Sequence, residues 1–355
     1  MILLFHTNER IEKMILINKK HFSLKLTILI VTLFMFCSCE KGSELDFEKI
    51  YSYDGLLYSD SEAKSVTGII GNVEIGYRVS VPADYKKKKV TIPAYYEGLP
   101  VFNVEILSKN IEEISVDEDS FYYSSQSGIL YDKDKTSLIF CPPQKTGVIK
   151  IPSSVTSIQS YAFYGSRATK IVFGKNLKKI MPYAFYNTAF TEFEIPKSVT
   201  EISENAFVGN EALSSVSVDK NNPIYYTKDD VLFDNNNTLI LYPNAKDQRD
   251  YILPDDTAKI SAAAFCGKMK VSIVHLNKSL TEIGEKNFSF TEGISIVLPD
   301  SVKKIGEGFC LNSSAVSLYC NFDESSYINS LLPKGKEITV HRGIWESIPL
   351  SPKEK

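Results

Sequence analysis

Histidine is scarce in this chain, and the motifs of common enzymes are missing. Only four histidines occur among 355 residues, and two of them, His6 and His21, lie near the N-terminus. No G-x-S-x-G, H-E-x-x-H or P-loop motif is present. A serine or cysteine nucleophile needs a histidine with an acidic partner. The sequence therefore predicts a protein that is not an enzyme and that uses no cofactor.

A large excess of charge of one sign is also missing. The chain has 40 basic and 43 acidic residues, a net charge of −3. Nucleic-acid binding requires a basic surface, so no nucleic-acid partner is expected. Glycine and proline, 18 and 15 in number, are too few for a collagen-like chain, and a hydrophobic fraction of 43% excludes a wholly disordered one.

Cysteines with metal-ligand spacing are absent. None of the four cysteines in the body of the chain belongs to a CxxC pair, and no histidine accompanies them at zinc-like spacing: Cys141, Cys266, Cys310 and Cys320. No metal site is therefore expected. Cys266 and Cys310 lie two repeats apart, a distance of about 10 Å in a stacked array, which is beyond the reach of a disulfide. We interpret the four as small apolar fillers of a core.

An apolar run long enough to cross a membrane is absent as well. The run over 24–36 has about a dozen apolar residues and follows a basic stretch, which predicts a signal peptide over 1–38. Cys37-Ser38-Cys39 resembles a bacterial lipobox with Cys39 as the acylated residue. The alternatives are an ordinary signal peptide and an uncleaved anchor. Because Met14 precedes a complete signal, residues 1–13 are a candidate for a misassigned start.

Residues 39–49 are expected to form a lipidated cysteine and a polar, acidic tether. In some Gram-negative lipoproteins, acidic residues after the lipidated cysteine accompany export to the outer face. We therefore expect an exported protein, anchored by lipid to the bacterial outer membrane and facing the cell exterior.

Internal repetition dominates the rest of the sequence. One unit, over 149–163, runs Ile149-Lys-Ile-Pro152, then two further apolar positions, then Ala162-Phe163. The proline position of this unit recurs at 152, 174, 196, 254, 277 and 299. The steps are 22 or 23 residues, apart from one gap of 58.

Each unit reads as one turn of a solenoid. Ile149-Lys150-Ile151 alternates inward and outward as a strand, and Pro152 ends it. Val155 and Ile158 then turn back into the interior. Because one unit buries too few apolar side chains to offset the entropy of ordering it, neighbouring units are obligatory. The predicted fold is an α/β repeat solenoid, a right-handed array of short parallel strands with short helical or irregular returns.

A longer period accounts for the gap of 58 residues. Residues 115–152 match 217–254, and each copy contains two apolar runs around a polar turn. This pattern predicts two β-hairpin inserts, near 121–143 and 224–243. Asp132 and Asp134 fit such a turn better than a calcium loop, since the glycine and glutamate of an EF-hand are missing.

The repeats are expected to span 115–322. Residues 50–114 precede them as an N-terminal β cap with a degenerate first repeat. Residues 323–355 follow as a C-terminal cap, with a last strand at 337–340 and Trp345, the only tryptophan, covering the open core.

The unit I-P-x-S-V-T-x-I-x-x-x-A-F resembles the BspA-like subtype of leucine-rich repeat proteins, although no asparagine ladder recurs. This resemblance implies a strand face that binds proteins and a role in adhesion to an extracellular or host protein. The outward strand positions are Lys150, Val172, Glu194, Ile252, His275 and Val297. The alternatives are a glycan-binding lipoprotein of a polysaccharide-uptake system and a structural envelope protein.

Overall fold

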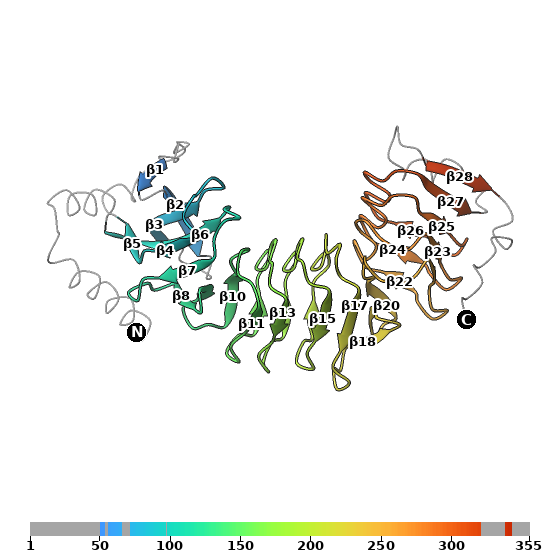
Figure 1. The fold of residues 1–355 in the computed structure, drawn as a ribbon, viewed down its shortest axis with the longest axis horizontal. Helices are drawn as coiled ribbons and strands as arrows, with labels where there is room; N and C mark the ends of the chain where they lie inside the picture. The colour runs from blue at the N-terminus through green and yellow to red at the C-terminus, as the bar shows by residue number, and fades with distance from the viewer. Residues whose placement is uncertain (1–49, 54–55, 66–71, 97, 321–337, 343–355) are drawn as a thin grey trace.

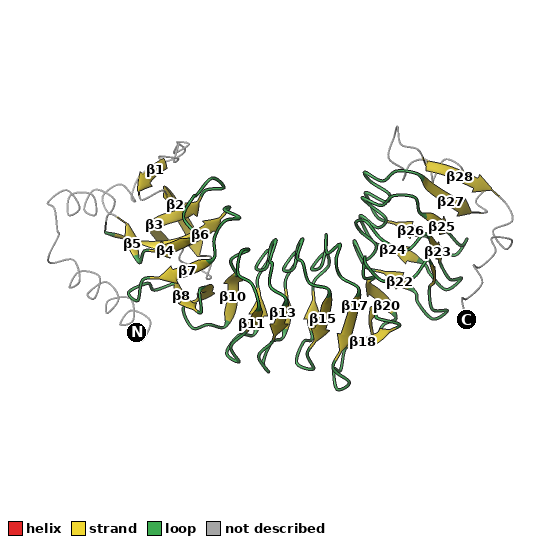
Figure 2. Ribbon diagram, viewed as in Figure 1, coloured by secondary structure: helices red, strands yellow, loops and turns green. Residues whose placement is uncertain are grey.

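The computed structural model describes residues 50–53, 56–65, 72–96, 98–320 and 338–342. These residues form 28 β-strands and no helix (Figure 2). The predicted signal peptide, Cys39 and the tether lie outside the described residues, and so do Trp345 and most of the predicted C-terminal cap. No helix able to cross a membrane occurs in the part of the chain that the structure describes.

The strands stack into an elongated array that curves into an arch (Figure 1). At one end, five strands form a mixed sheet in the order β1-β2-β3-β6-β5. Their bounds are Ile50–Tyr53, Leu56–Ser65, Asn72–Val81, Leu99–Ile106 and Tyr95–Tyr96 in that order. Next to this sheet, β4 (Lys89–Ile92) and β7 (Glu113–Val116) pair in parallel. Here the chain begins to stack strands of equivalent position.

The first strand of each repeat belongs to what we call the first sheet, in which strands lie parallel and in register. Ile149 pairs with Ile171, and Lys150 with Val172. Ile149 is buried and Lys150 exposed, which confirms the predicted alternation. The strands form three groups: β11 (Val148–Lys150) and β13 (Lys170–Val172); β15 (Glu192–Ile195) and β17 (Ser215–Val218); and β21 (Asp250–Ile252), β23 (Ile273–His275), β25 (Ser295–Val297), β27 (Val316–Cys320) and β28 (Ile338–Arg342).

A second strand of two residues follows in each repeat, where the sequence predicted only an inward turn. Ile158 pairs with Ile180, and both are fully buried. These strands form the second sheet: β12 (Ser157–Ile158), β14 (Lys179–Ile180), β16 (Glu201–Ile202), β22 (Lys259–Ile260), β24 (Glu282–Ile283) and β26 (Lys304–Ile305).

The two segments predicted as hairpin inserts are part of the array instead. Each is a three-stranded antiparallel meander. Its last strand pairs in parallel with the second sheet, because Leu138 lies in register with Ile158 and Leu239 with Ile260. The meanders are β8 (Tyr123–Gln126), β9 (Ile129–Asp132) and β10 (Ser137–Phe140), and β18 (Tyr225–Lys228), β19 (Val231–Asp234) and β20 (Thr238–Leu241).

The Ala-Phe segments form tight turns and not the short helical returns that were predicted. The N–H of Phe163 donates to the carbonyl of Ala184 at 2.8 Å, and that of Phe185 to Ala206 at 2.9 Å. An α-helix needs these N–H groups for carbonyls four residues earlier in the same segment. Since they bond to the next repeat, the segment turns without becoming helical.

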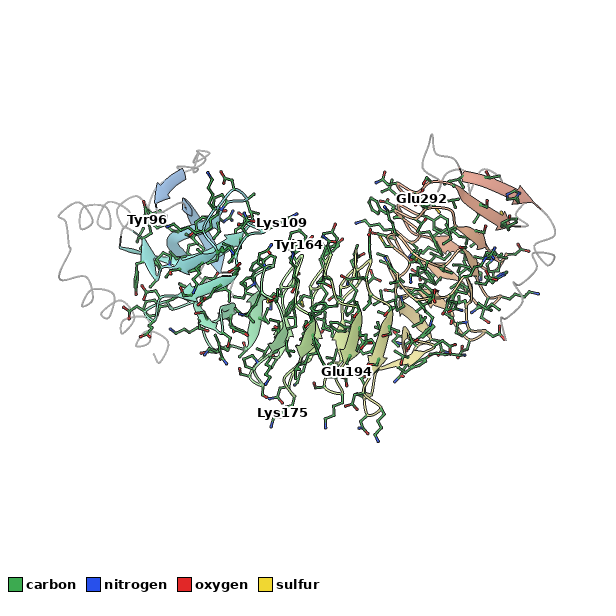
Figure 3. All side chains as sticks on the ribbon, viewed as in Figure 1. Tyr96, Lys109, Tyr164, Lys175, Glu194 and Glu292 are labelled. Atoms are coloured by element: carbon green, nitrogen blue, oxygen red, sulfur yellow. The ribbon has the colours of Figure 1, made fainter. Side chains whose placement is uncertain are left out.

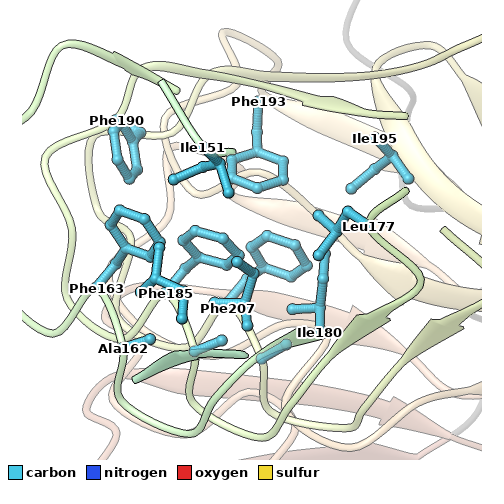
Figure 4. Close-up of a cluster of buried hydrophobic side chains, with 14 of the residues drawn as sticks. Ile151, Ala162, Phe163, Leu177, Ile180, Phe185, Phe190, Phe193, Ile195 and Phe207 are labelled. Atoms are coloured by element: carbon cyan, nitrogen blue, oxygen red, sulfur yellow. The ribbon is translucent and has the colours of Figure 1, made fainter. Parts of the chain in front are cut away.

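Stacked phenylalanines fill the core behind these turns (Figure 4). Ring centroids are 5.1 Å apart between Phe163 and Phe185, and 5.4 Å apart between Phe185 and Phe207. Phe265 and Phe288 continue the pattern in later repeats at 5.0 Å. Each repeat thus completes the core of its neighbour, as expected for a solenoid.

Buried asparagines also join neighbouring repeats, although the sequence shows no continuous asparagine ladder. Asn210 Oδ1 accepts hydrogen bonds from the backbone N–H and the hydroxyl of Thr188, both at 2.8 Å. Asn287 accepts from the N–H of Phe265 at 3.0 Å and donates to the carbonyl of Ser261 at 2.9 Å. The amide side chains satisfy buried backbone groups, but at different positions of the repeat.

Candidate interaction surfaces

Charged side chains on the outward side of the second sheet pair with one another across repeats. Lys179 Nζ lies 2.7 Å from Glu201 Oε2. Glu282 contacts Lys304 at 2.8 Å and Lys259 at 3.6 Å. The hydrogen bond from Lys304 holds the pKa of Glu282 below its usual value. This surface therefore offers a partner mostly charges that are already paired.

The outward side of the first sheet, which we call the strand face, is different. Four of the six predicted binding positions are exposed there: Lys150, Val172, Glu194 and Ile252. Val172 is 44% exposed and Ile252 is 53% exposed, and Val148 adds a third exposed aliphatic side chain. Lys150 and Glu194 take part in no ion pair among the described residues. Apolar and unpaired charged groups thus alternate on this surface.

The other two predicted positions are less accessible. His275 is partly buried, and Val297 is only 2% exposed, so the expectation of an exposed outward residue is wrong at Val297. Val297 lies in register between His275 and Tyr319, and larger rings on both sides cover a smaller side chain. Tyr319 in turn stacks on His341 with 4.5 Å between ring centroids. Fewer outward side chains of the strand face are therefore accessible toward its C-terminal end.

His275 has the environment of a packed side chain. Burial lowers its pKa, and the negative charge of Asp250 opposes this shift. Its Nε2 atom is buried without a hydrogen-bond partner among the described residues. No hydrogen bond joins the imidazole to a serine, threonine or cysteine in the described part of the chain, so the geometry gives it no nucleophile to activate.

The four cysteines of the body are buried, and none of them forms a disulfide within the described part of the chain. Burial raises the pKa of Cys141 and Cys310 to about 12 and that of Cys266 to about 11. These three thiols therefore stay protonated at neutral pH and act as core side chains.

Asp132 accepts the backbone N–H groups of Thr136 and Ser137 at 2.7 and 2.8 Å, as a turn residue does.

Tyr164 lies on the inner side of the arch, opposite the side that carries Glu194 (Figure 3), and it belongs to a cluster of four tyrosines in contact with one another. We call it the tyrosine patch: Tyr161, Tyr164, Tyr183 and Tyr186. Tyr161 stacks on Tyr183 at 5.2 Å, and Tyr164 on Tyr186 at 5.5 Å. Sequence reasoning missed this cluster, although Tyr-Ala-Phe-Tyr occurs in two successive repeats.

A groove of about 640 Å³ adjoins the tyrosine patch, between the end of β6 and the first repeats. Its apolar lining includes Ile106, Leu107, Ile139 and Phe140. Leu107 is 50% exposed although it is aliphatic. Lys109 is the one charged lining residue in the described part of the chain, with Nζ 5.3 Å from the centroid of Tyr164.

The family model described as BspA type leucine rich repeat region, in six copies, matches residues 139–249 and 241–330 of the chain. The chain belongs to the BspA-type leucine-rich repeat family. No curated protein sequence matches this BspA-type chain.

Several solved structures are similar to this BspA-type protein. A leucine-rich repeat protein from Eubacterium ventriosum is 21% identical with a TM-score of 0.48, and the match covers 76% of this chain and 73% of that one. The pneumococcal vaccine antigen PcpA is 17% identical with a TM-score of 0.43, over 84% and 100% of the two chains. A leucine rich cell surface protein from Faecalibacterium prausnitzii is 17% identical with a TM-score of 0.43, over 78% and 89%.

The surfaces of this BspA-type array present groups for binding. The strand face combines aliphatic side chains with unpaired charges, and the groove combines an apolar lining with a cation and hydroxyl groups. No cluster of three or more possible metal ligands occurs among the described residues. What these residues can do chemically is to bury apolar groups of a partner and pair with its charges.

Proposed function

We propose that this protein is a non-catalytic scaffold that binds an extracellular protein through its strand face. The contrast between its two sheet surfaces supports this proposal. On the second sheet, Lys179 and Glu282 have partners within the array. On the strand face, Lys150 and Glu194 have none, and exposed Val172 lies beside Lys150. Unpaired charges beside exposed aliphatic groups are the mixture that protein interfaces contain.

The geometry of the strand face suits a protein partner. Parallel strands lie about 4.8 Å apart, so equivalent side chains of successive repeats form a regular surface. Lys150 and Val172 are direct neighbours in register. A partner that covers several neighbouring strands would bury the aliphatic side chains and pair with the charges. The outward side of a single strand does not supply enough area for stable binding.

We further propose that the protein is exported and anchored by a lipid on Cys39, facing outward from the bacterial outer membrane. This part rests on the apolar run 24–36, on the lipobox-like Cys37-Ser38-Cys39 and on the acidic tether that follows. Such an anchor would hold the array at the surface, where a protein outside the cell can reach it.

The experiment is a binding screen with the purified full-length protein against extracellular-matrix proteins and, in parallel, a panel of polysaccharides. The double variant Lys150→Glu/Glu194→Lys keeps net charge and reverses both unpaired charges. Its control is Lys178→Glu, the reversal of one exposed lysine beside the second sheet, away from the strand face. We expect saturable binding to a matrix protein that weakens about fivefold or more in the double variant and stays unchanged in the control.

The other outcomes separate the alternatives. Binding to polysaccharides alone would overturn the proposal in favour of glycan capture. Absence of binding in both arms would favour a structural envelope protein. Protein binding that the double variant leaves unchanged would show that the strand face is not the site.

A further inference from the structure

We propose that the groove beside the tyrosine patch is a second binding site, which takes an extended peptide segment of a partner protein with an apolar side chain next to a carboxylate. The site shares no residue with the strand face. It lies on the opposite side of the arch, where Figure 3 shows Lys109 and Tyr164, whereas Glu194 lies on the other side. The inference therefore stands or falls independently of the proposed function.

The fold does not require tyrosine at these positions. Tyr161 and Tyr183 adopt left-handed backbone conformations, with φ of 60° and 59°. Bulky residues are uncommon there, whereas asparagine is tolerated. The equivalent position before Ala-Phe holds Asn205, with φ of 62°, and Ala263, with φ of 53°. The same turn thus forms without an aromatic ring, so the backbone conformation does not account for the two rings.

The rings are placed at the surface and not in the core. Tyr161 is 47% exposed and also lines the groove. The hydroxyls of the tyrosine patch make no hydrogen bond within the described part of the chain. They are therefore available as donors to backbone carbonyls or carboxylates of a ligand, while the ring faces offer apolar contact.

The lining of the groove favours a peptide over a sugar. Ile106, Leu107, Ile139 and Phe140 give it an aliphatic and aromatic floor. A sugar would need several convergent polar side chains to replace its hydration, and the polar atoms here come from Ser160, Lys109 and the tyrosine hydroxyls. About 640 Å³ lies within the usual range for a pocket that buries a small ligand or a few side chains.

Charge complementarity specifies the carboxylate. No acidic residue lines the groove in the described part of the chain. Gln144 Nε2 donates to the carbonyl of Lys109 at 2.8 Å, and Arg167 donates to Gln144 Oε1 at 2.9 Å. Gln144 thus links Arg167, which does not itself line the groove, to the backbone of Lys109, which does. Neither of them forms an ion pair with a described residue.

The experiment begins with a phage-displayed library of random peptides, selected on the purified full-length protein. Selected peptides are then synthesised with a fluorescent label, and their dissociation constants are measured by fluorescence polarisation. Tyr161→Asn is the key variant, because Asn205 occupies the equivalent turn with nearly the same φ. Phe290→Asn is its matched control: Phe290 is also exposed and left-handed, at φ of 59°, but lies in a distant repeat. An unchanged thermal midpoint checks the fold of each variant.

We expect enrichment of peptides that combine aliphatic or aromatic residues with Asp or Glu. Their affinity should fall about tenfold or more in Tyr161→Asn and stay unchanged in Phe290→Asn. It should also fall in Lys109→Glu but not in Lys175→Glu, because Lys175 is an exposed lysine on the side of the arch away from Tyr164 (Figure 3). Peptides that bind wild type and Tyr161→Asn equally would overturn the proposal, and so would selection of basic peptides or of none. Retention of peptide binding in Lys150→Glu/Glu194→Lys would show that the two sites are separate, whatever the outcome at the strand face.

Discussion

Replacing Phe185 with alanine tests how the repeats hold one another together. The side chain is fully buried, and its ring is stacked between those of Phe163 and Phe207. Phe193 packs against it from the first sheet, with 4.7 Å between centroids. Truncation of a buried phenylalanine costs about 3–5 kcal/mol, and the cost rises when the surroundings cannot collapse into the space.

The surroundings of Phe185 are held in place by the backbone. The N–H of Phe163 donates to the carbonyl of Ala184, and the N–H of Phe185 donates to Ala206. Because these bonds fix the spacing of the repeats, the neighbouring rings cannot close the cavity. We therefore expect Phe185→Ala to lower the free energy of unfolding by about 4–5 kcal/mol, in the upper half of that range.

The assay is urea denaturation followed by circular dichroism, together with limited proteolysis and mapping of the first cuts. Buried contacts divide the repeats into one cluster from Ile129 to Leu241 and another from Val231 to Cys320. The first cuts should therefore fall in the first cluster. Phe290→Ala, at a side chain that is 52% exposed, should change stability by less than about 0.5 kcal/mol. A loss below about 1.5 kcal/mol for Phe185→Ala, or an equal loss for Phe290→Ala, would refute the reasoning.

Two further predictions concern pH and the anchor. Burial lowers the pKa of His275 in the folded protein, so the stability it contributes is present above the unfolded value of about 6.5 and is lost as pH falls toward the lowered pKa. The denaturation midpoint should therefore drop less between about pH 7.5 and pH 5.5 in His275→Gln than in wild type, and an equal drop in both would contradict this. Cys39→Ala should release the protein from the membrane fraction of the producing cells; a variant that is cleaved at its signal but still sediments with membranes would disprove the lipid anchor.

The sequence predicts the first sheet well because its signal is local and periodic. Ile149 and Lys150 alternate within one strand, and a step of 22 residues brings Lys150 beside Val172. The spacing between repeats is therefore sufficient to predict which residues of neighbouring strands pair. The exposure of Lys150, Val172, Glu194 and Ile252 could be read in the same way.

The turns and the meanders could not be predicted in this way, since their form depends on the next repeat. Ala162-Phe163 is compatible with a helical turn as an isolated segment, but the N–H of Phe163 bonds to the carbonyl of Ala184 and the N–H of Gly165 to that of Tyr186, both in the following unit. Similarly, the run around Leu138 reads as half of a hairpin until Ile158 pairs with it from the other side. Burial of Val297 depends on Tyr319, one strand further along the chain.

A repeat protein supplies its own controls for separating structural from functional residues. Phe163, Phe185 and Phe207 occupy equivalent positions with equivalent burial, so packing alone explains their identity. Tyr161 and Asn205 also occupy equivalent positions with nearly the same φ, yet the backbone conformation explains neither choice, because both support the same turn. Where equivalent positions of the repeats share a backbone conformation but carry different side chains, we attribute the choice of side chain to contacts with a partner outside the array. By this criterion the inner tyrosines are as strong a candidate for recognition as the strand face, and the substitution that tests them already exists two repeats along the chain.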